Sequence, residues 1–462
     1  MFNGSMMIDK NYLFEEERPG KALAVMALPT IISQMIVLIY NIADTWYIGR
    51  TNNPDMVGAS SLAVTLYLAV VALSNVFGVG GGTLMARLEG EKRTEDARKV
   101  ASYSVAIATI CTLVFSLSIL IFLNPLLRFL GADNSTIVYA RQYVMMTSVI
   151  GGIPTVLSMC MPQLLRNAGY ARQAGFGVAM GSLLNVALDP LFMFVILPHG
   201  KEVLGAGIAT MLSNVISMVY FVVLFIKLKD KTVLSIPTRI EKIGPENTKA
   251  LYSVGVPAAF AIFLFDVVTI ALNKMIVEYG NIALAAMGIV LKVERLPMYI
   301  GIGICLGMVP LIAYNYGSGN MERMKEISAA AIKAVIISSI ICTVLMVVFA
   351  RPIMWEFIKN EATVGYGVAF LKARALAMPF MVIGNFIVHY MNAVGKGKVS
   401  FVLAVIRHLV LILPVMIVMN IIFGLKGLVW SQLASDVINT AIAIMIFFRV
   451  EKTIMREGGE DT

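Results

Sequence analysis

The apolar stretch Ala22–Gly49, ALAVMALPTIISQMIVLIYNIADTWYIG, decides the fold of this chain. As a helix, its roughly 28 residues would be about 42 Å long, whereas the hydrocarbon core of a bilayer is about 30 Å thick. The stretch can therefore cross a membrane if it tilts or bends, and Pro29 provides a place to bend. Asp44 lies deep in the stretch, where an isolated carboxylate costs on the order of 3 kcal/mol. Asp44 is therefore either an interfacial residue beside Trp46 and Tyr47 or a group that the protein pairs, solvates or uses.

The composition of the whole chain indicates a polytopic membrane protein. Of its 462 residues, 58% are hydrophobic and 14% are charged, whereas soluble domains carry roughly 25% charged residues. The net charge of +9 is explained most simply by basic cytoplasmic loops, so we expect no nucleic-acid partner. The four cysteines stand alone without a CxxC motif, and they indicate neither a disulfide framework nor a metal centre.

Twelve apolar runs of spanning length follow one another along the chain, separated by short polar breaks. The chain is therefore predicted to be an all-α membrane protein. The N-terminus has no signal-peptide pattern, so we expect the first run to be an uncleaved anchor. The predicted spans are 22–49, 58–86, 97–123, 137–165, 172–197, 204–228, 248–278, 283–312, 326–350, 364–393, 398–422 and 427–448.

Basic residues concentrate in every second loop, most clearly after the second and sixth spans. The positive-inside rule then places both termini in the cytoplasm of a multi-pass cell-membrane protein that contacts lipid. The predicted organisation is a cytoplasmic N-terminal segment (1–21), an N-lobe with helices 1–6 (22–228), a cytoplasmic linker (229–247), a C-lobe with helices 7–12 (248–450) and a cytoplasmic tail (451–462).

The two halves of the sequence repeat. Pro29 matches Pro257 at an offset of 228 residues, and later matches occur at a slowly drifting offset, as loop insertions and deletions would produce. Because six spans per repeat is an even number, the halves share an orientation and should be related by a parallel pseudo-two-fold axis. The further matches are Gly90 with Gly317, Pro125 with Pro352, Pro154 with Pro379 and Pro190 with Pro414.

Positions where the repeat breaks are candidates for function. Asp44, Asn185 and Asp189 map to leucines in the second half, so only the N-lobe carries these polar groups. Asn185 and Asp189 are four residues apart and share a helix face. At a rise of 1.5 Å per residue along each helix, Asp44, Asp189 and Thr210 lie at similar depths in the outer half of the membrane, on three different helices.

These side chains predict a cation-coupling site made of Asp44, Asn185, Asp189 and Thr210. Their oxygens suit a hard monovalent metal ion such as Na⁺. Alternatively, the two carboxylates hold a single proton, because like charges raise one pKa of such a pair. A third possibility is that Asn185 and Asp189 only form hydrogen bonds between helices.

The C-lobe has its own intramembrane acid, Asp266, which we predict to face the substrate cavity and attract cationic compounds. Lys292, Glu294 and Arg295 fall inside the eighth predicted span. Glu294 and Arg295 either pair with each other or line a wet cavity, and we place Arg295 in the substrate cavity with Asp266. His389 and His408 lie on neighbouring spans, where a packing role and a functional role are both open.

Four stretches carry a family resemblance: YNIADTWYIG in the first span, LLNVALDP in the fifth, GAGIATMLS in the sixth and VPLIAYNYGSGN at the end of the eighth. Through them the chain resembles the multidrug and toxic compound extrusion (MATE) family over nearly its whole length. The resemblance implies two six-helix lobes, a V-shaped cavity and cation-coupled antiport of organic, often cationic, compounds.

The same resemblance implies roles for individual residues. The family's N-lobe site combines a first-helix Asp, a fifth-helix Asn and Asp, and a sixth-helix Thr, which match the four residues of the predicted cation site. Pro29 matches the proline at which the first helix bends. Some members also carry a seventh-helix acid, which Asp266 resembles, together with a tenth-helix Asp. This chain has only Asn385 and His389 in that last region, so the resemblance does not extend to a C-lobe cation site.

We therefore expect a monomeric antiporter, coupled to Na⁺ or H⁺, that exports small organic cations by alternating access and needs no other cofactor. A flippase for lipid-linked precursors, from the same wider superfamily, is the alternative, and it would have a strongly cationic cavity. A membrane enzyme is the third class. The sequence contains no GxSxG, HExxH or CxxC motif, so we do not predict an enzyme.

Overall fold

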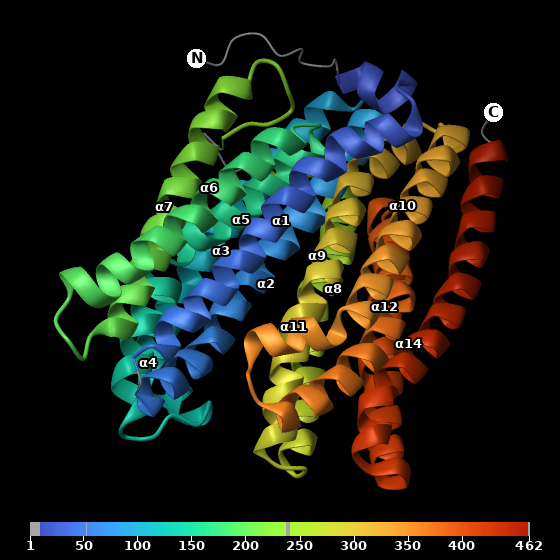
Figure 1. Ribbon diagram of the computed structural model, residues 1–462. Helices are drawn as coiled ribbons and strands as arrows, with labels where there is room; N and C mark the ends of the chain where they lie inside the picture. The colour runs from blue at the N-terminus through green and yellow to red at the C-terminus, as the bar shows by residue number, and fades with distance from the viewer. Residues whose placement is uncertain (1–9, 52, 237–240, 461–462) are drawn as a thin grey trace.

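The computed structural model describes residues 10–51, 53–236 and 241–460, and these residues form helices and short connections (Figure 1). The first half contains η1 (Tyr12–Glu16), α1 (Pro19–Gly49), α2 (Pro54–Gly90), α3 (Thr94–Phe129), α4 (Thr136–Val144), η2 (Met145–Ile150), α5 (Gly152–Asn167), α6 (Ala171–Pro190), η3 (Leu191–Ile196) and α7 (Glu202–Leu228). The second half contains α8 (Pro245–Val277), α9 (Asn281–Gly317), α10 (Met321–Val348), α11 (Ala350–Phe357), α12 (Glu361–Ala393), α13 (Gly397–Val405), η4 (Ile406–Ile412) and α14 (Leu413–Glu460).

Within the described residues, ten helices are long and apolar enough to cross a membrane. An eleventh span is the pair Thr136–Ile150 and Gly152–Asn167, which is bent by 54°. The last helical stretch, Gly397–Arg456, is 60 residues long, and a straight helix of that length would measure about 90 Å, far more than one bilayer. It is broken at Gly424, where φ is +58° and ψ is −142°. The break divides this stretch into two spans, one on each side of Gly424. Together with the bent pair, this brings the total to twelve.

The two halves form two lobes that lie side by side, the first coloured blue to green and the second yellow to red in Figure 1. The first two helices of each half pack across the boundary, since α1 packs against α9 and α2 packs against α8. The start of α1 and the end of α14 lie at the same end of the bundle (Figure 1). We call this end of the bundle the N-terminal end.

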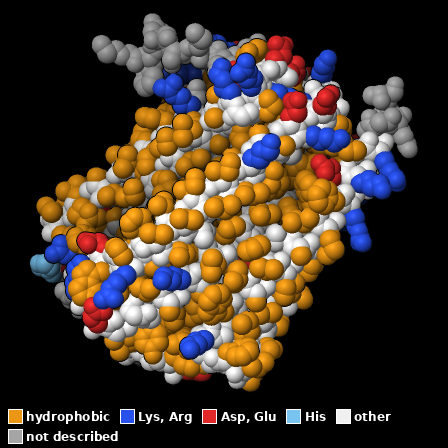
Figure 2. Space-filling view, turned by 45° about the vertical axis from the view of Figure 1, so that its right-hand side comes forward, with side chains coloured by type: hydrophobic (Ala, Val, Ile, Leu, Met, Phe, Trp, Pro, Cys, Tyr) orange, Lys and Arg blue, Asp and Glu red, His pale blue; other side chains and the backbone are white. Residues whose placement is uncertain are grey.

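Small residues allow the close approach of helices from different lobes. A side chain at Gly80 of α2 would collide with the backbone of Leu251 and Gly255 on α8, and one at Gly255 would collide with the backbone of Val76. Helix association in lipid depends on such close packing, because lipid tails are as apolar as the helix surfaces. Figure 2 shows hydrophobic side chains across the middle of one face, with charged side chains gathered toward its two ends.

The predicted spans agree with the observed helices to within several residues at most of their ends, and the helices are longer than predicted at many of them. Parts of the predicted N-terminal segment (1–9), linker (237–240) and tail (461–462) lie outside the described residues. The remaining linker residues run along the N-terminal end of the first lobe, where Arg98 of α3 donates a hydrogen bond to the carbonyl of Thr232 at 3.5 Å.

Candidate cation site and central cavity

Two carboxyl groups come together inside the first lobe. Asp44 of α1 and Asp189 of α6 are close enough to interact electrostatically. Asp189 is completely buried, with 0% of its surface exposed, and Asp44 is partly buried. One carboxylate oxygen of each is buried without a hydrogen-bond partner among the described residues. Two ionised carboxylates repel strongly in a low-dielectric interior, so this pair favours a bound proton or cation.

Asn185 links Asp189 to the neighbouring helix α7. Its side-chain amide lies 2.9 Å from Oδ2 of Asp189 and 3.2 Å from Oγ1 of Thr210. A carboxylate can only accept, so the amide nitrogen of Asn185 faces Asp189 and its oxygen accepts from Thr210. All four residues predicted for the cation site therefore lie together in one lobe, on α1, α6 and α7.

Three tyrosines lie around the acids and an asparagine lies beside one of these tyrosines. The sequence analysis missed all four. Tyr40 and Tyr143 interact electrostatically with both Asp44 and Asp189. Tyr143 also lies within hydrogen-bonding reach of Thr210, and Tyr67 within reach of Asn214. Tyr40 precedes Asp44 by four residues, so helix periodicity could have placed it on the same face. The other residues come from α2, α4 and α7, and nothing in their local sequence indicates this meeting.

The composition of the site suits a hard cation or a proton rather than a transition metal. Among the described residues, no group of three or more His, Cys, Asp or Glu side chains could hold a metal ion. Two carboxylates, an amide and a hydroxyl are instead the oxygen donors that hard cations use.

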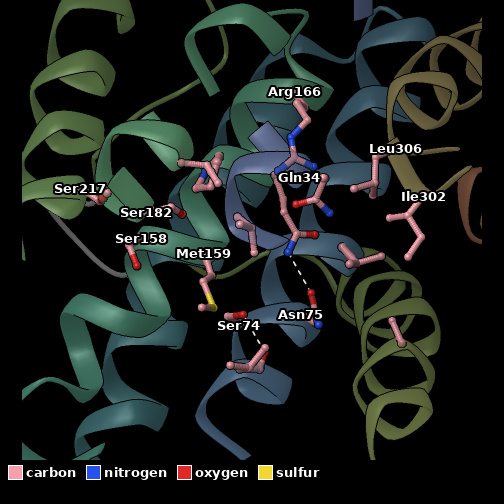
Figure 3. A pocket seen from close by; sticks show the side chains of 18 of the residues that line it. Gln34, Ser74, Asn75, Ser158, Met159, Arg166, Ser182, Ser217, Ile302 and Leu306 are labelled. Carbon is pink, nitrogen blue, oxygen red and sulfur yellow. Dashed lines mark hydrogen bonds between the residues drawn. The ribbon is translucent and has the colours of Figure 1, made fainter. Parts of the chain in front are cut away.

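A cavity of about 460 Å³ lies between the lobes. The first-lobe wall comes from α1, α2, α5, α6 and α7, and the second-lobe wall from α8, α9, α12 and α13. Asn185 and Thr210 are part of this wall, so the acids lie directly behind it. Figure 3 shows its polar side chains, where Gln163 donates to Oδ1 of Asn75 at 2.8 Å. Further polar residues in the wall include Gln34, Ser74, Arg166, Ser182, His389 and Asn392.

The structure does not bring Asp266 and Arg295 into this cavity. Neither residue is part of its wall. Asp266 on α8 is partly buried and interacts electrostatically with Arg295 on α9, which is exposed. The predicted placement of both residues in the cavity is therefore corrected to a charge pair outside it.

Glu294 does not pair with Arg295, which was one of the two possibilities that the sequence left open. It forms a two-pronged ion pair with Arg374 of α12, with distances of 2.5 Å from Nε and 2.7 Å from Nη2. A second buried pair joins Arg407 of η4 to Asp436 of α14 at 2.9 Å. The sequence analysis missed these pairs, although each member is a charged residue inside an apolar span. Glu294 and Asp436 of the second lobe are thus neutralised by arginines, unlike Asp44 and Asp189.

The two intramembrane histidines have different surroundings. His389 lines the cavity, and its Nδ1 atom lies 2.8 Å from the carbonyl of Asn385. His408 is buried in η4, and its ring packs edge-on against Phe265. Of the two, only His389 has access to a bound compound.

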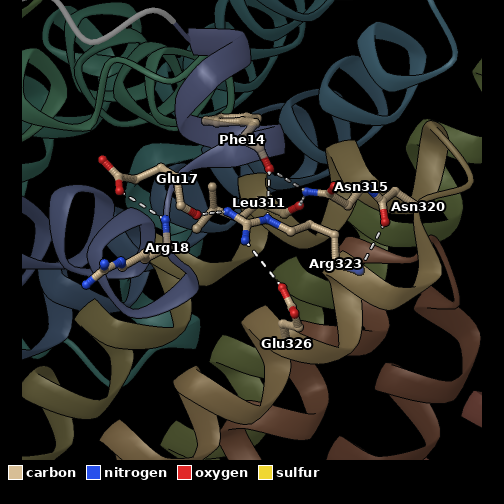
Figure 4. A network of polar contacts seen from close by, with 8 residues as sticks. All are labelled: Phe14, Glu17, Arg18, Leu311, Asn315, Asn320, Arg323 and Glu326. Carbon is tan, nitrogen blue, oxygen red and sulfur yellow. Dashed lines mark hydrogen bonds and ion pairs between the residues drawn. The ribbon is translucent and has the colours of Figure 1, made fainter.

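The segment before α1 forms hydrogen bonds with helices of the second lobe, as Figure 4 shows. Arg323 of α10 donates to the backbone carbonyls of Phe14 and Glu17, and Asn315 of α9 donates to the carbonyl of Phe14. The Phe14 ring is completely buried. Lys10 forms a 2.5 Å ion pair with Glu89 of α2. The segment therefore ties the first lobe to the second.

Twelve membrane spans in two lobes, a polar cavity between the lobes and unneutralised acids behind one wall are the features of a secondary transporter. Comparison with known proteins specifies the family. The model of the MatE family matches residues 29–191 and 257–418. The chain belongs to this family. The two matched segments begin at Pro29 and Pro257, as the repeat in the sequence predicted.

Individual relatives agree with the family assignment. The multidrug export protein MepA of Staphylococcus aureus (strain MRSA252) is 29% identical over 443 residues, which are 96% of each chain. A solved MATE structure in complex with MaL6 has a TM-score of 0.91 and 21% identity over 98% of this chain and 100% of its own. The structure of a multidrug resistance MATE family transporter in an outward-facing conformation has a TM-score of 0.88 and is 21% identical in sequence. The match covers 98% of this chain and 99% of that one. These structures confirm the predicted all-α, twelve-helix, two-lobe fold.

Proposed function

We propose that this protein exports organic cations across the cell membrane by antiport against Na⁺ or H⁺, with alternating access to the central cavity. The observation that carries the proposal is the Asp44–Asp189 pair, which has no basic partner among the described residues and lies behind the cavity wall. MepA, with which the chain aligns over nearly its full length, is named a multidrug export protein. The same function requires no enzymatic chemistry from the cavity.

In this proposal one cation binds to Asp44, Asn185, Asp189 and Thr210. The cation is a proton shared by the carboxylates, or Na⁺ held by the four oxygen-bearing side chains. Its binding removes the repulsion between the acids and favours one conformation of the lobe, and driving such a switch requires a preference of several kcal/mol. The membrane potential adds about 2.3 kcal/mol per charge per 100 mV.

Pro29 is the proposed hinge. It lies inside α1, the helix that also carries Asp44, and it removes one backbone hydrogen bond from that helix. Its carbonyl oxygen packs against Gly175 of α6, where a side chain would collide with it. A bend of α1 at this point would move Asp44 relative to Asp189, which links cation binding to the shape of the cavity.

The substrate class follows from the cavity wall. Tyr40 and Tyr67 line it, and tyrosine faces attract organic cations. The volume of about 460 Å³ suits a drug-sized molecule. A flippase for lipid-linked precursors is not favoured, because such a cavity should be strongly cationic, whereas Arg166 is the one arginine or lysine in the described wall.

The proposed orientation places the N-terminal end of the bundle in the cytoplasm of a monomeric cell-membrane protein. The loop between α2 and α3 lies at this end and contains Lys92 and Arg93, and α14 ends there with Arg449, Lys452 and Arg456. This distribution follows the positive-inside rule.

Dye transport in vesicles containing the purified protein tests the proposal. A Na⁺ gradient or a pH gradient is imposed, and movement of a fluorescent organic cation against its own gradient is recorded. Uphill movement with one of the two gradients is expected. Absence of uphill movement with either gradient, in vesicles whose protein binds the dye, would refute coupled export.

A further inference from the structure

The central cavity contains an arginine whose charge no neighbouring residue balances. Arg166 is in the last turn of α5 and lines the cavity. Figure 3 shows its guanidinium group directed toward Gln34. Its Nε atom is buried without a partner, and its side chain forms no hydrogen bond or ion pair with the described residues. The nearby wall residues Gln163 and Asn167 are neutral amides.

Among the described residues, Arg87 and Arg98 also have guanidinium nitrogens that are buried without a partner, but neither residue lines the cavity. Two arginines of the second lobe are matched to acids. Arg374 is paired with Glu294, and Arg407 is paired with Asp436. Arg166 is partly buried, and a charge that is shielded from water without a partner is costly. Because Arg166, unlike Arg87 and Arg98, lines a cavity that a compound can enter, its missing carboxylate partner can come from outside the protein.

We propose that Arg166 is an anion-binding subsite of the cavity and holds the carboxylate of the exported compound. This inference rests on the proposed export function and extends its substrate class to zwitterions, which carry a carboxylate as well as a positive charge. The guanidinium fork matches the two oxygens of a carboxylate and can form two parallel hydrogen bonds with it. The amides of Gln34 and Gln163 provide further donors beside it.

With Arg166 at one end and the acids at the other, the two ends of the cavity have opposite charge. Arg166 lies close to the start of α6, whereas Asn185, which also lines the cavity, is 14 residues beyond Ala171 on that helix, or about 21 Å at 1.5 Å per residue. Asp189, which Asn185 contacts, and its neighbour Asp44 make the opposite end of the cavity negative. A zwitterion with its carboxylate on Arg166 therefore points its positive group toward the tyrosines and acids, and its carboxylate stays away from the coupling cation.

A matched pair of dyes tests this inference. The probes are a rhodamine with a free benzoate group and the methyl ester of the same rhodamine, which differ in the carboxylate alone. Equilibrium binding to purified protein is measured by fluorescence anisotropy, and transport is measured in vesicles. The variants are Arg166→Gln, which removes the charge, and Arg166→Lys, which keeps the charge without the fork. Arg98→Gln is the control, because Arg98 also has a buried, unpartnered Nε atom but does not line the cavity.

For Arg166→Gln we expect the Kd of the benzoate dye to rise roughly ten- to hundredfold, the equivalent of a charge-assisted hydrogen bond. The ester should bind as it does to the unmodified protein. Arg166→Lys should retain part of the affinity, which also guards against misfolding of the glutamine variant. Equal losses for both dyes, or no loss for either, would overturn the subsite. An unmodified protein that binds the ester but not the benzoate dye would overturn it too, whereas binding of both dyes without uphill transport would refute the export function itself.

Discussion

Gly90 of α2 and Gly317 of α9, which match in the sequence repeat, pack against each other's helix at the N-terminal end. A side chain at Gly90 would collide with the backbone of Tyr314 and Ser318, and one at Gly317 would collide with the backbone of Arg87. The same two positions of the repeat therefore meet across the boundary between the lobes. This reciprocal contact is one of the places where the backbones of the two lobes come into close contact.

Substitution of either glycine should open this contact. Overpacking of a close contact costs about 1–3 kcal/mol, so Gly90→Ala and Gly317→Ala should shift the protein toward a state in which the lobes separate here. Electron–electron resonance between spin labels at the exposed positions Glu95 and Lys325 measures the separation. Gly288→Ala on α9 is the control, because a side chain there meets no other atom. Unchanged distance distributions in both variants would show that the contact does not limit opening.

The segment before α1 should stabilise the same closed end. Phe14→Ala removes a completely buried ring, a change that costs about 3–5 kcal/mol in a protein core. We expect a larger fraction of long distances between the two spin labels. Tyr12→Ala in the same segment, where the side chain is exposed, should leave the distribution unchanged. If the Phe14→Ala variant has the same distance distribution as the unmodified protein, this segment does not stabilise the closed end.

The buried pair Glu294–Arg374 should stabilise the second lobe only as a pair. Arg374→Met leaves a buried carboxylate alone and should cost about 3–5 kcal/mol, whereas Arg374→Met with Glu294→Leu should recover most of the loss. Thermal unfolding in detergent provides the comparison. Breaking the exposed pair Arg351–Glu361 with Arg351→Met should cost less than about 1 kcal/mol. Losses that add in the double variant would mean that the two residues act independently.

The sequence predicted the regular parts of the structure well. Length and hydropathy were enough for the spans, and the offset between Pro29 and Pro257 was enough for the repeat, because both depend on local patterns. The residues of the proposed cation site, Asp44, Asn185, Asp189 and Thr210, could be grouped because depth along a helix follows from residue number.

Partners across helices were much harder to predict. For Glu294 the sequence left two possibilities open, a pair with Arg295 or a place in a wet cavity, yet it pairs with Arg374, which lies 80 residues away. Asp266 and Arg295 were placed in the cavity because depth was known but helix rotation was not. The N-terminal segment was predicted only as a cytoplasmic segment outside the lobes, although its residue Phe14 is completely buried. Each of these features depends on which helix faces are in contact, and hydropathy does not encode that information.

The position of Asp266 leads to a prediction for its substitution. Because Asp266 lies beside Arg295 and outside the cavity wall, Asp266→Asn should alter the transport of cationic and neutral dyes by the same factor. Initial rates in vesicles for two dyes of similar size measure this ratio. A selective loss for the cationic dye would instead assign the attraction of substrate to Asp266.

The account depends most on the claim that Asp44 and Asp189 couple a cation to transport. Uphill transport of a cationic dye by Asp44→Asn and Asp189→Asn is the most direct measurement, with dye binding determined on the same preparations. Asp230→Asn, in an exposed loop, is the matched control. We predict that both site variants bind the dye but cannot accumulate it against its gradient, while the control transports it like the unmodified protein. Continued accumulation by either site variant would contradict the claim.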